Sequence, residues 1–165
     1  MQALIGLGSN LDHPSQRLIS ALRALQHLPG ITLRQHSRLY TSAPVGPQDQ
    51  PDYINAVASF TVTLGAEVLL DALQAIENAH GRTRSGGRWT ARTLDLDILL
   101  YGSQEINTDR LKVPHPWMKQ REFVIHPLYE IAPDLSLPDG SLLVDCLELV
   151  AADSLEVVSA KIKGP

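Results

Sequence analysis

Residues 94–101 read Leu94-Asp95-Leu96-Asp97-Ile98-Leu99-Leu100-Tyr101, and apolar and acidic side chains alternate over the first half of this stretch. Alternation with a period of two predicts a β-strand with one face in the core. Asp95 and Asp97 then share the opposite face. The side chains expected to face the core are Leu94, Leu96, Ile98 and Leu100.

The segments around this strand complete a pattern of strands and helices. Residues 3–7, 31–41 and 53–64 are predicted strands, and the last of these turns Tyr53 and Asn55 away from the core. Helices are predicted from Pro14 onward and over about residues 66–80, where leucine and isoleucine recur at helical spacing. The order strand, helix, strand, strand, helix, strand predicts a ferredoxin-like α+β fold, βαββαβ, with an antiparallel sheet and flanking helices.

Beyond Tyr101 the pattern weakens, and we expect C-terminal additions to this fold. The sequence predicts helices over about residues 118–131 and 141–150, and nothing is assigned to the last fifteen residues. A chain of 165 residues fits one domain. We therefore treat residues 1–165 as a single domain.

Composition excludes several classes of protein. The formal net charge of −4 disfavours nucleic acid and anionic membranes as partners. A single cysteine, Cys146, excludes an internal disulfide and is expected in the core. The N-terminus lacks the basic run of a signal peptide, and no apolar run reaches the roughly 18–20 residues of a membrane span. We expect a cytoplasmic protein.

Two carboxylates on one strand face carry a cost that a bound cation would remove. We expect the Cα atoms of Asp95 and Asp97 roughly 6.5–7 Å apart. Carboxylates about 6 Å apart repel by on the order of 3 kcal/mol at an effective dielectric constant of about 20. Carboxylate oxygen is a preferred ligand of Mg²⁺. The pair is a candidate magnesium site; the alternative is a solvated sheet face.

The segment before this strand is strongly basic, with no acid between Glu77 and Asp95. A planar guanidinium matches phosphate oxygens two at a time. The glycines at positions 86 and 87 suggest a mobile lid. A basic loop that leads into an acid pair has the parts that phosphoryl transfer from ATP requires, whereas the alternative is a solvated loop. The arginines of this loop are Arg82, Arg84, Arg88 and Arg92.

Three other positions are candidates for ligand binding. Pro114 and Pro116 flank His115 and restrict its backbone, so an aimed ring is expected, although a histidine can simply fill a turn. An amide such as that of Asn55 can pair with the donor–acceptor edge of a heterocycle. An exposed Tyr53 and Asn55 without function is the alternative.

Taken together, these segments resemble the 6-hydroxymethyl-7,8-dihydropterin pyrophosphokinases of folate biosynthesis. The resemblance covers about four-fifths of the chain, and its most specific part is the Arg-x-x-Asp-x-Asp block that ends at Asp97. It implies a ferredoxin-like monomer that uses two Mg²⁺ ions to transfer the terminal diphosphate of ATP to a pterin alcohol, releasing AMP. The matching segments are residues 6–10, 46–55, 88–99, 113–116 and 131–134.

The resemblance also implies a role for each matched residue. Asp95 and Asp97 correspond to magnesium ligands, and Arg82 and Arg92 to residues that neutralise charge in the transition state. The ATP-binding positions are Gln74, Glu77, Arg84, Arg88, Ile98, Arg110, His115 and Arg121. The pterin-binding positions are Ser42, Val45, Tyr53, Asn55, Trp89 and Phe123.

Two other functions fit parts of the sequence. Paired aspartates on a ferredoxin-like sheet also suit a magnesium-dependent nucleotidyltransferase, which would attach AMP to an acceptor and release pyrophosphate. A non-catalytic ferredoxin-like module could instead bind RNA, a nucleotide or a regulatory metabolite. An aromatic content of 5% and the negative net charge argue against a surface that stacks single-stranded bases.

Overall fold

The computed structural model describes residues 1–10, 13–42, 52–80, 94–150 and 155–159. Within these ranges the main sheet has six strands. In this sheet β5, β1 and β4 are neighbours in that order, β4 pairs along its other edge with β2 and β3, and every pair is antiparallel. The sheet and the order of elements confirm the predicted ferredoxin-like fold. The strands are β1 (Gln2–Ser9), β2 (Ile31–His36), β3 (Leu39–Ser42), β4 (Tyr53–Val62), β5 (Asp95–Tyr101) and β8 (Glu156–Ser159).

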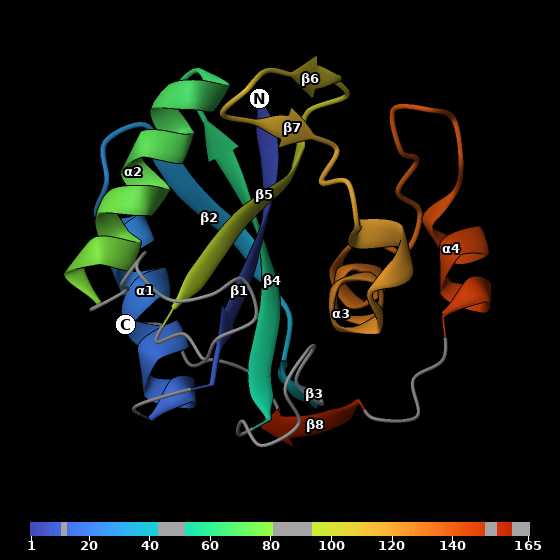
Figure 1. Ribbon diagram of the computed structural model, residues 1–165, viewed down its shortest axis with the longest axis horizontal. Coiled ribbons are helices and arrows are strands. Elements are labelled where there is room, and N and C mark those ends of the chain that lie inside the picture. The colour runs from blue at the N-terminus through green and yellow to red at the C-terminus, as the bar shows by residue number, and fades with distance from the viewer. Residues whose placement is uncertain (11–12, 43–51, 81–93, 151–154, 160–165) are drawn as a thin grey trace.

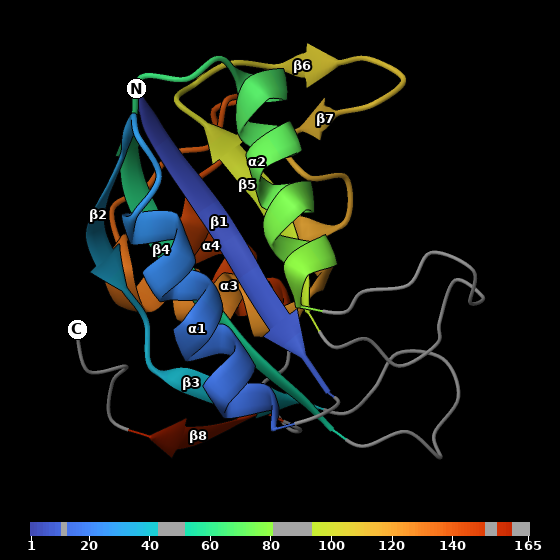
Figure 2. The same cartoon turned by 90° about the vertical axis from the view of Figure 1, so that its left-hand side faces the viewer.

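Helices cover both faces of this sheet. Helices α1 (Pro14–Gln26) and α2 (Ala66–Ala79) lie on one face, and α3 (Glu122–Ile131) and α4 (Leu143–Leu149) lie on the other (Figure 1). Figure 2 looks onto the first face, with α1 and α2 in front of the strands and α3 and α4 behind them. A hairpin of β6 (Ile106–Asn107) and β7 (Lys112–Val113) and a 3₁₀ turn, η1 (Met118–Gln120), connect β5 to α3.

The sheet therefore separates two cores. Under α1 and α2, residues such as Leu18, Phe60 and Leu73 are buried together, and under α3 and α4 a second cluster includes Val57 and Leu128. The second cluster corrects the prediction for β4. Its expected outer face is covered by α3, so Asn55 and Ser59 are buried, 5% and 4% exposed.

Strand β5 departs from the predicted alternation at Leu99. Leu4 of β1 pairs with Leu100, and Ile5 pairs with Ile98, so Leu99 is an extra residue that bulges. Leu94, Leu96 and Ile98 face the core of α1 and α2 as predicted, but Leu100 lies in the core of α3 and α4. The prediction for Leu100 is wrong because one extra residue reverses the alternation.

Other boundaries also differ from the sequence prediction. The expected strand over residues 31–41 is two strands, and at the break Ser37 exchanges hydrogen bonds with the backbone of Val57. The helix predicted from residue 118 begins as the 3₁₀ turn η1, and no pattern in the sequence predicts β8. Cys146 is buried, as predicted. Among the helices of the described ranges, none is long and apolar enough to cross a membrane.

Candidate active site

The acid pair lies at the start of β5, on the sheet face that carries α3 and α4. Leu94, Leu96 and Ile98 all belong to the core of the other face. The alternation of the strand therefore places Asp95 and Asp97 side by side on the opposite face, as predicted. Both are half-buried.

Two glycines of β1 lie directly beside the acids. Gly8 pairs with Asp95 and Gly6 with Asp97. On its other side, Gly8 pairs with Asn55 of β4. No β1 side chain stands between the acid pair and this asparagine, which lies two strand spacings away, roughly 10 Å. A bare stretch of sheet of this kind allows a ligand to approach the backbone closely.

The amide of Asn55 is held in one orientation. Its Nδ2 donates a hydrogen bond of 2.7 Å to Ser42 Oγ, and both side chains are buried. Its Oδ1 faces β1, because a Cβ built on Gly8 would come within 3.0 Å of that oxygen. The structure thus brings together two of the predicted pterin-binding residues and turns an acceptor toward the bare stretch.

A buried carboxylate supports the strand between the two acids. Glu77, near the end of α2, is 3% exposed, and its Oε2 accepts a 2.8 Å hydrogen bond from the backbone N–H of Leu96. Strand β5 is at the edge of the sheet, so this N–H has no strand partner beyond it among the described residues. Glu77, predicted to bind ATP, therefore also fixes the backbone from which Asp95 and Asp97 project.

His115, Arg121 and Phe123 gather where the chain enters α3. The His115 N–H donates to the carbonyl of Leu99, the bulged residue of β5, at 3.1 Å. The Trp117 N–H donates to His115 Nδ1 at 3.2 Å, so the neutral ring carries its hydrogen on Nε2. Burial, and then the charge of Arg121, lower the pKa of His115 to about 4. The Arg121 guanidinium lies 5.6 Å from the Phe123 ring centroid, a cation–π contact.

The remaining described candidates lie along α2 or within the sheet. Arg110 forms ion pairs with Glu67 and Asp71 of α2. Asp71, Gln74 and Glu77 follow one another at a spacing of three residues, which places them along one stripe of that helix. The ion pairs therefore link Arg110 to the stripe that holds Gln74 and Glu77, which are also predicted to bind ATP. Ile98 is buried in the core of α1 and α2, and Tyr53, half-buried, pairs with Ser42.

Several candidates lie outside the described residues, so their placement stays a prediction. They include the whole basic segment that precedes β5. These candidates are Val45, Arg82, Arg84, Arg88, Trp89 and Arg92.

Gly6 and Gly8 contribute to the site in a way that was not predicted from the sequence. Their Gly-x-Gly spacing is the same as the Asp-x-Asp spacing of the acids. Glycine inside a strand often marks a close approach of a ligand or another backbone. The Gly-x-Gly spacing is visible in the sequence, but its meaning for the site depends on the pairing of β1 with β5.

The donor set fits a magnesium ion that is shared with phosphate. In the part of the chain that the structure describes, no three His, Cys, Asp or Glu side chains gather into a metal cluster. Mg²⁺ usually binds through one or two carboxylates and completes its shell with water and substrate phosphates. Two half-buried aspartates beside side-chain-free glycines meet that requirement.

Comparison with known proteins places the chain in a family. Residues 4–133 match the family model of 7,8-dihydro-6-hydroxymethylpterin-pyrophosphokinase (HPPK). The chain is 51% identical over 149 residues to the 2-amino-4-hydroxy-6-hydroxymethyldihydropteridine pyrophosphokinase of Haemophilus influenzae, which covers 90% of this chain and 92% of that protein. It is 49% identical over 152 residues to the protein of the same name from Pseudomonas aeruginosa, with 92% and 93% covered.

Solved structures agree on the fold. A crystal structure of HPPK-DHPS in complex with substrates has a TM-score of 0.71 at 10% identity and covers 90% of this chain but 43% of its own. Wild-type Plasmodium falciparum HPPK-DHPS with pteroate has a TM-score of 0.71 at 11% identity, with 90% and 42% covered. The chain thus spans less than half the length of these two proteins. Since the family model and both bacterial relatives extend over most of its length, the chain belongs to the HPPK family.

Proposed function

We propose that this chain transfers the terminal diphosphate of ATP to the hydroxymethyl oxygen of 6-hydroxymethyl-7,8-dihydropterin, a step of folate biosynthesis. One observation carries the proposal. Asp95 and Asp97 share a sheet face with the oriented amide of Asn55, and only glycine of β1 separates them. A diphosphate with its cation suits one end of this arrangement, and a flat heterocycle suits the other.

The heterocycle end is formed by β3, β4 and the start of α3. Asn55 Oδ1 accepts from the donor edge of the pterin, while Ser42 keeps the amide in that orientation. Tyr53 and Phe123 supply aromatic surface for stacking. Val45 and Trp89, which the sequence adds to this end, complete the proposed pterin site.

The phosphate end is formed by the acids and by cationic side chains. Asp95 and Asp97 would hold two Mg²⁺ ions, which when bound neutralise charge on the phosphates. Arg82 and Arg92 neutralise charge that develops as the diphosphate moves. The Nε2–H of His115 donates toward ATP. The other residues of the proposed nucleotide site are Gln74, Glu77, Arg84, Arg88, Ile98, Arg110 and Arg121.

In the proposed reaction the hydroxymethyl oxygen attacks the β-phosphorus of ATP. The new bond joins that oxygen to phosphorus, and the bond between the β-phosphorus and the oxygen that bridges to the α-phosphate breaks. AMP leaves with the electron pair, and the hydroxyl proton is released. The residues around the bare stretch of β1 hold the two substrates in line for this displacement.

Product analysis tests the proposal. The purified chain, incubated with Mg²⁺, ATP and the pterin alcohol, is expected to form AMP and pterin diphosphate, resolved by chromatography. Asp97→Asn, which keeps the side-chain shape, should abolish turnover. Asp139→Asn, in an exposed turn of the described chain, should not. Free pyrophosphate with AMP joined to the acceptor would favour a nucleotidyltransferase, and tight, salt-sensitive oligonucleotide binding would favour a binding module.

We further propose that residues 1–165 act as one monomeric domain in the cytoplasm, without nucleic acid or membrane partners. Helices from the same chain cover both faces of the sheet, and β8 covers the outer edge of β3. The buried single cysteine suits a reducing compartment. Light scattering during size-exclusion chromatography should give a mass near 18.1 kDa.

A further inference from the structure

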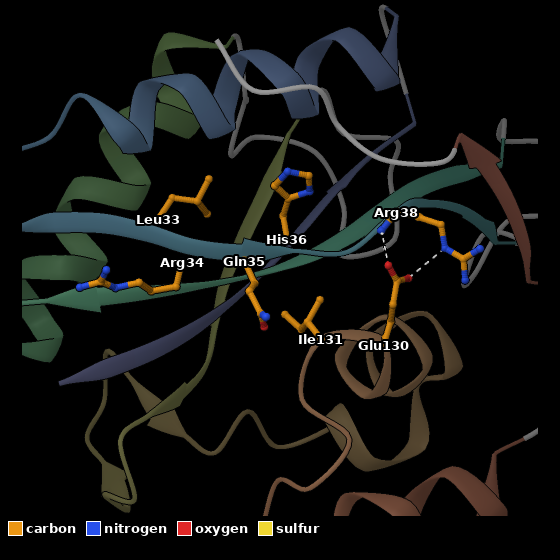
Figure 3. Close-up of a pocket in the computed structure, with 7 residues that line it drawn as sticks. All are labelled: Leu33, Arg34, Gln35, His36, Arg38, Glu130 and Ile131. Carbon is orange, nitrogen blue, oxygen red and sulfur yellow. Dashed lines mark hydrogen bonds and ion pairs between the residues drawn. The ribbon is translucent and has the colours of Figure 1, made fainter.

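The carboxylate of Glu130 links the last turn of α3 to the segment that leads into β3. Its Oε2 accepts from the Arg38 backbone N–H at 3.1 Å, and its Oε1 accepts from Arg38 Nε at 3.3 Å (Figure 3). Oε1 also accepts a hydrogen bond from the hydroxyl of Tyr40. Both carboxylate oxygens are thus bonded to the same short piece of chain.

Tyr40 connects this carboxylate to the proposed pterin site. It is buried and lies directly opposite Asn55 in the register of β3 and β4. Two residues further along β3, Ser42 accepts the hydrogen bond from the Asn55 amide. Burial, and then the bond to Glu130, raise the pKa of the Tyr40 hydroxyl, which therefore stays protonated and donates. Over its described residues Leu39–Ser42, β3 pairs with β4 and β8, and the Glu130–Tyr40 bond adds a side-chain contact between this strand and α3.

The opposite end of α3 carries another part of the proposed pterin site. Phe123 lies in its first turn and Glu130 in its last, seven residues apart. Seven residues are two helical turns, so both side chains lie on one face of the helix, about 10.5 Å apart along its axis. The helix packs on β4 and β3, and its most buried residues include Val124, Ile125 and Leu128. The helix therefore extends from Phe123 of the proposed pterin site to Glu130, which contacts the strand whose Ser42 orients the Asn55 amide.

We propose that Glu130 and Tyr40 are positioning residues of the pterin site, whose hydrogen bond fixes the distance between the Phe123 ring and the Asn55 amide. The inference rests on the proposed function. Without the bond, Glu130 keeps, among the described residues, only its hydrogen bonds from Arg38, which precedes β3, so α3 is no longer tied to β3 itself and the two elements can shift relative to each other. A shift of β3 moves Ser42 and frees the Asn55 amide to rotate. The acids of β5 lie on a different strand and keep their position.

The test compares Tyr40→Phe and Glu130→Leu with matched controls; leucine is used because a glutamine carbonyl could still accept the hydrogen bond from Tyr40. Tyr129→Phe removes the same hydroxyl from α3, where the ring packs on the core of α3 and α4, and Glu148→Leu makes the same exchange at an exposed acid of α4. Calorimetry measures the Kd of a non-hydrolysable ATP analogue with Mg²⁺, and then the Kd of the pterin with that analogue saturating. Tyr40→Phe and Glu130→Leu should raise the pterin Kd about tenfold and change the analogue Kd by less than about twofold.

The double variant and the wild type provide further tests. The double variant should bind pterin no more weakly than the weaker single variant, because Glu130→Leu already removes the bond that Tyr40 donates. Equal losses for the two ligands would overturn the inference in favour of general destabilisation, and wild-type pterin affinity in Tyr40→Phe would overturn it outright. If Glu130→Leu fails to fold, the pterin affinity of Tyr40→Phe still tests the inference. A wild-type chain that neither binds pterin nor forms AMP would reject the proposed function itself.

Discussion

Gly6 and Gly8 each pair with one acid of β5, but the side chains near the two glycines differ. The three atoms nearest to a Cβ at Gly6 would all belong to Leu99, at 3.5 to 3.7 Å, which is ordinary van der Waals contact. A Cβ at Gly8 would come 3.0 Å from Asn55 Oδ1, so the amide would have to move. The two positions therefore form a natural matched pair for testing the bare stretch of β1.

We expect Gly8→Ala to weaken pterin binding by about 10- to 100-fold, because misplacement of a positioning group by even 1 Å can cost this much. Gly6→Ala should change it by less than about threefold, as no polar group is displaced. Calorimetry with the pterin and a saturating ATP analogue measures both. Equal effects of the two substitutions would show that the Asn55 amide does not depend on the space at Gly8.

His115 is a second residue whose chemistry depends on its neighbours. Its pKa falls from 6.5 to about 4 through burial and the nearby Arg121 charge. We expect a ¹⁵N NMR titration to report a pKa near 4, with the hydrogen on Nε2 at neutral pH. A pKa near 6.5 would contradict the burial of the ring and its hydrogen bond from Trp117.

The same shift has a consequence for stability. The unfolded chain binds more protons than the folded chain between pH 4 and 6.5, since the folded pKa is the lower one. The contribution of neutral His115 to the free energy of unfolding is therefore complete above about pH 6.5 and is lost as the pH falls toward 4. As the pH falls from about 6.5 toward 4, urea unfolding should show that the free energy of unfolding decreases more in the wild type than in His115→Gln.

At the scale of secondary-structure elements, the position of the acid pair depends on a contact between α2 and β5. The Glu77 carboxylate accepts the hydrogen bond of the Leu96 backbone N–H at the outer edge of β5. Glu77→Leu should lower the free energy of unfolding by about 1–3 kcal/mol, because a buried N–H loses its partner. It should also weaken Mg²⁺ binding with the ATP analogue by about 10- to 100-fold, as loss of an outer-shell support does.

The conservative variant Glu77→Gln controls for this effect. Its side-chain carbonyl can still accept from Leu96, so both losses should be smaller than in Glu77→Leu. Magnesium titration by calorimetry and urea unfolding measure the two quantities independently. If Glu77→Leu lowered stability and left Mg²⁺ affinity unchanged, the contact would serve the fold and not the acids.

At the scale of the whole molecule, the second core makes the sheet a layer between two sets of helices. Leu143 of α4 is completely buried in this core, whereas Leu149 of the same helix is 85% exposed. Leu143→Ala should lower the free energy of unfolding by about 2–5 kcal/mol. Leu149→Ala should change it by less than about 0.5 kcal/mol. Urea unfolding measures both, and similar values would contradict the packing of α4 against the sheet.

The strongest sequence patterns predicted structure well because local chemistry specifies them. The leucine spacing of α1 and α2 and the alternation up to Ile98 need no knowledge of distant residues. The direction of Leu100 could not be predicted, since a bulge depends on how β1 pairs with β5. Strand β8 has a weak pattern and exists through its pairing with β3. The burial of Asn55 depends on α3, which is far away in the sequence.

The order of elements, the acid pair and its position on one strand face are properties of the sequence alone, because side-chain periodicity and residue type are local. Only the tertiary structure places glycine beside those acids, turns the Asn55 amide toward them and joins α3 to β3 through Glu130. These features arise from contacts between residues that are 13 to 92 positions apart. Such contacts are determined by packing, which no local pattern encodes.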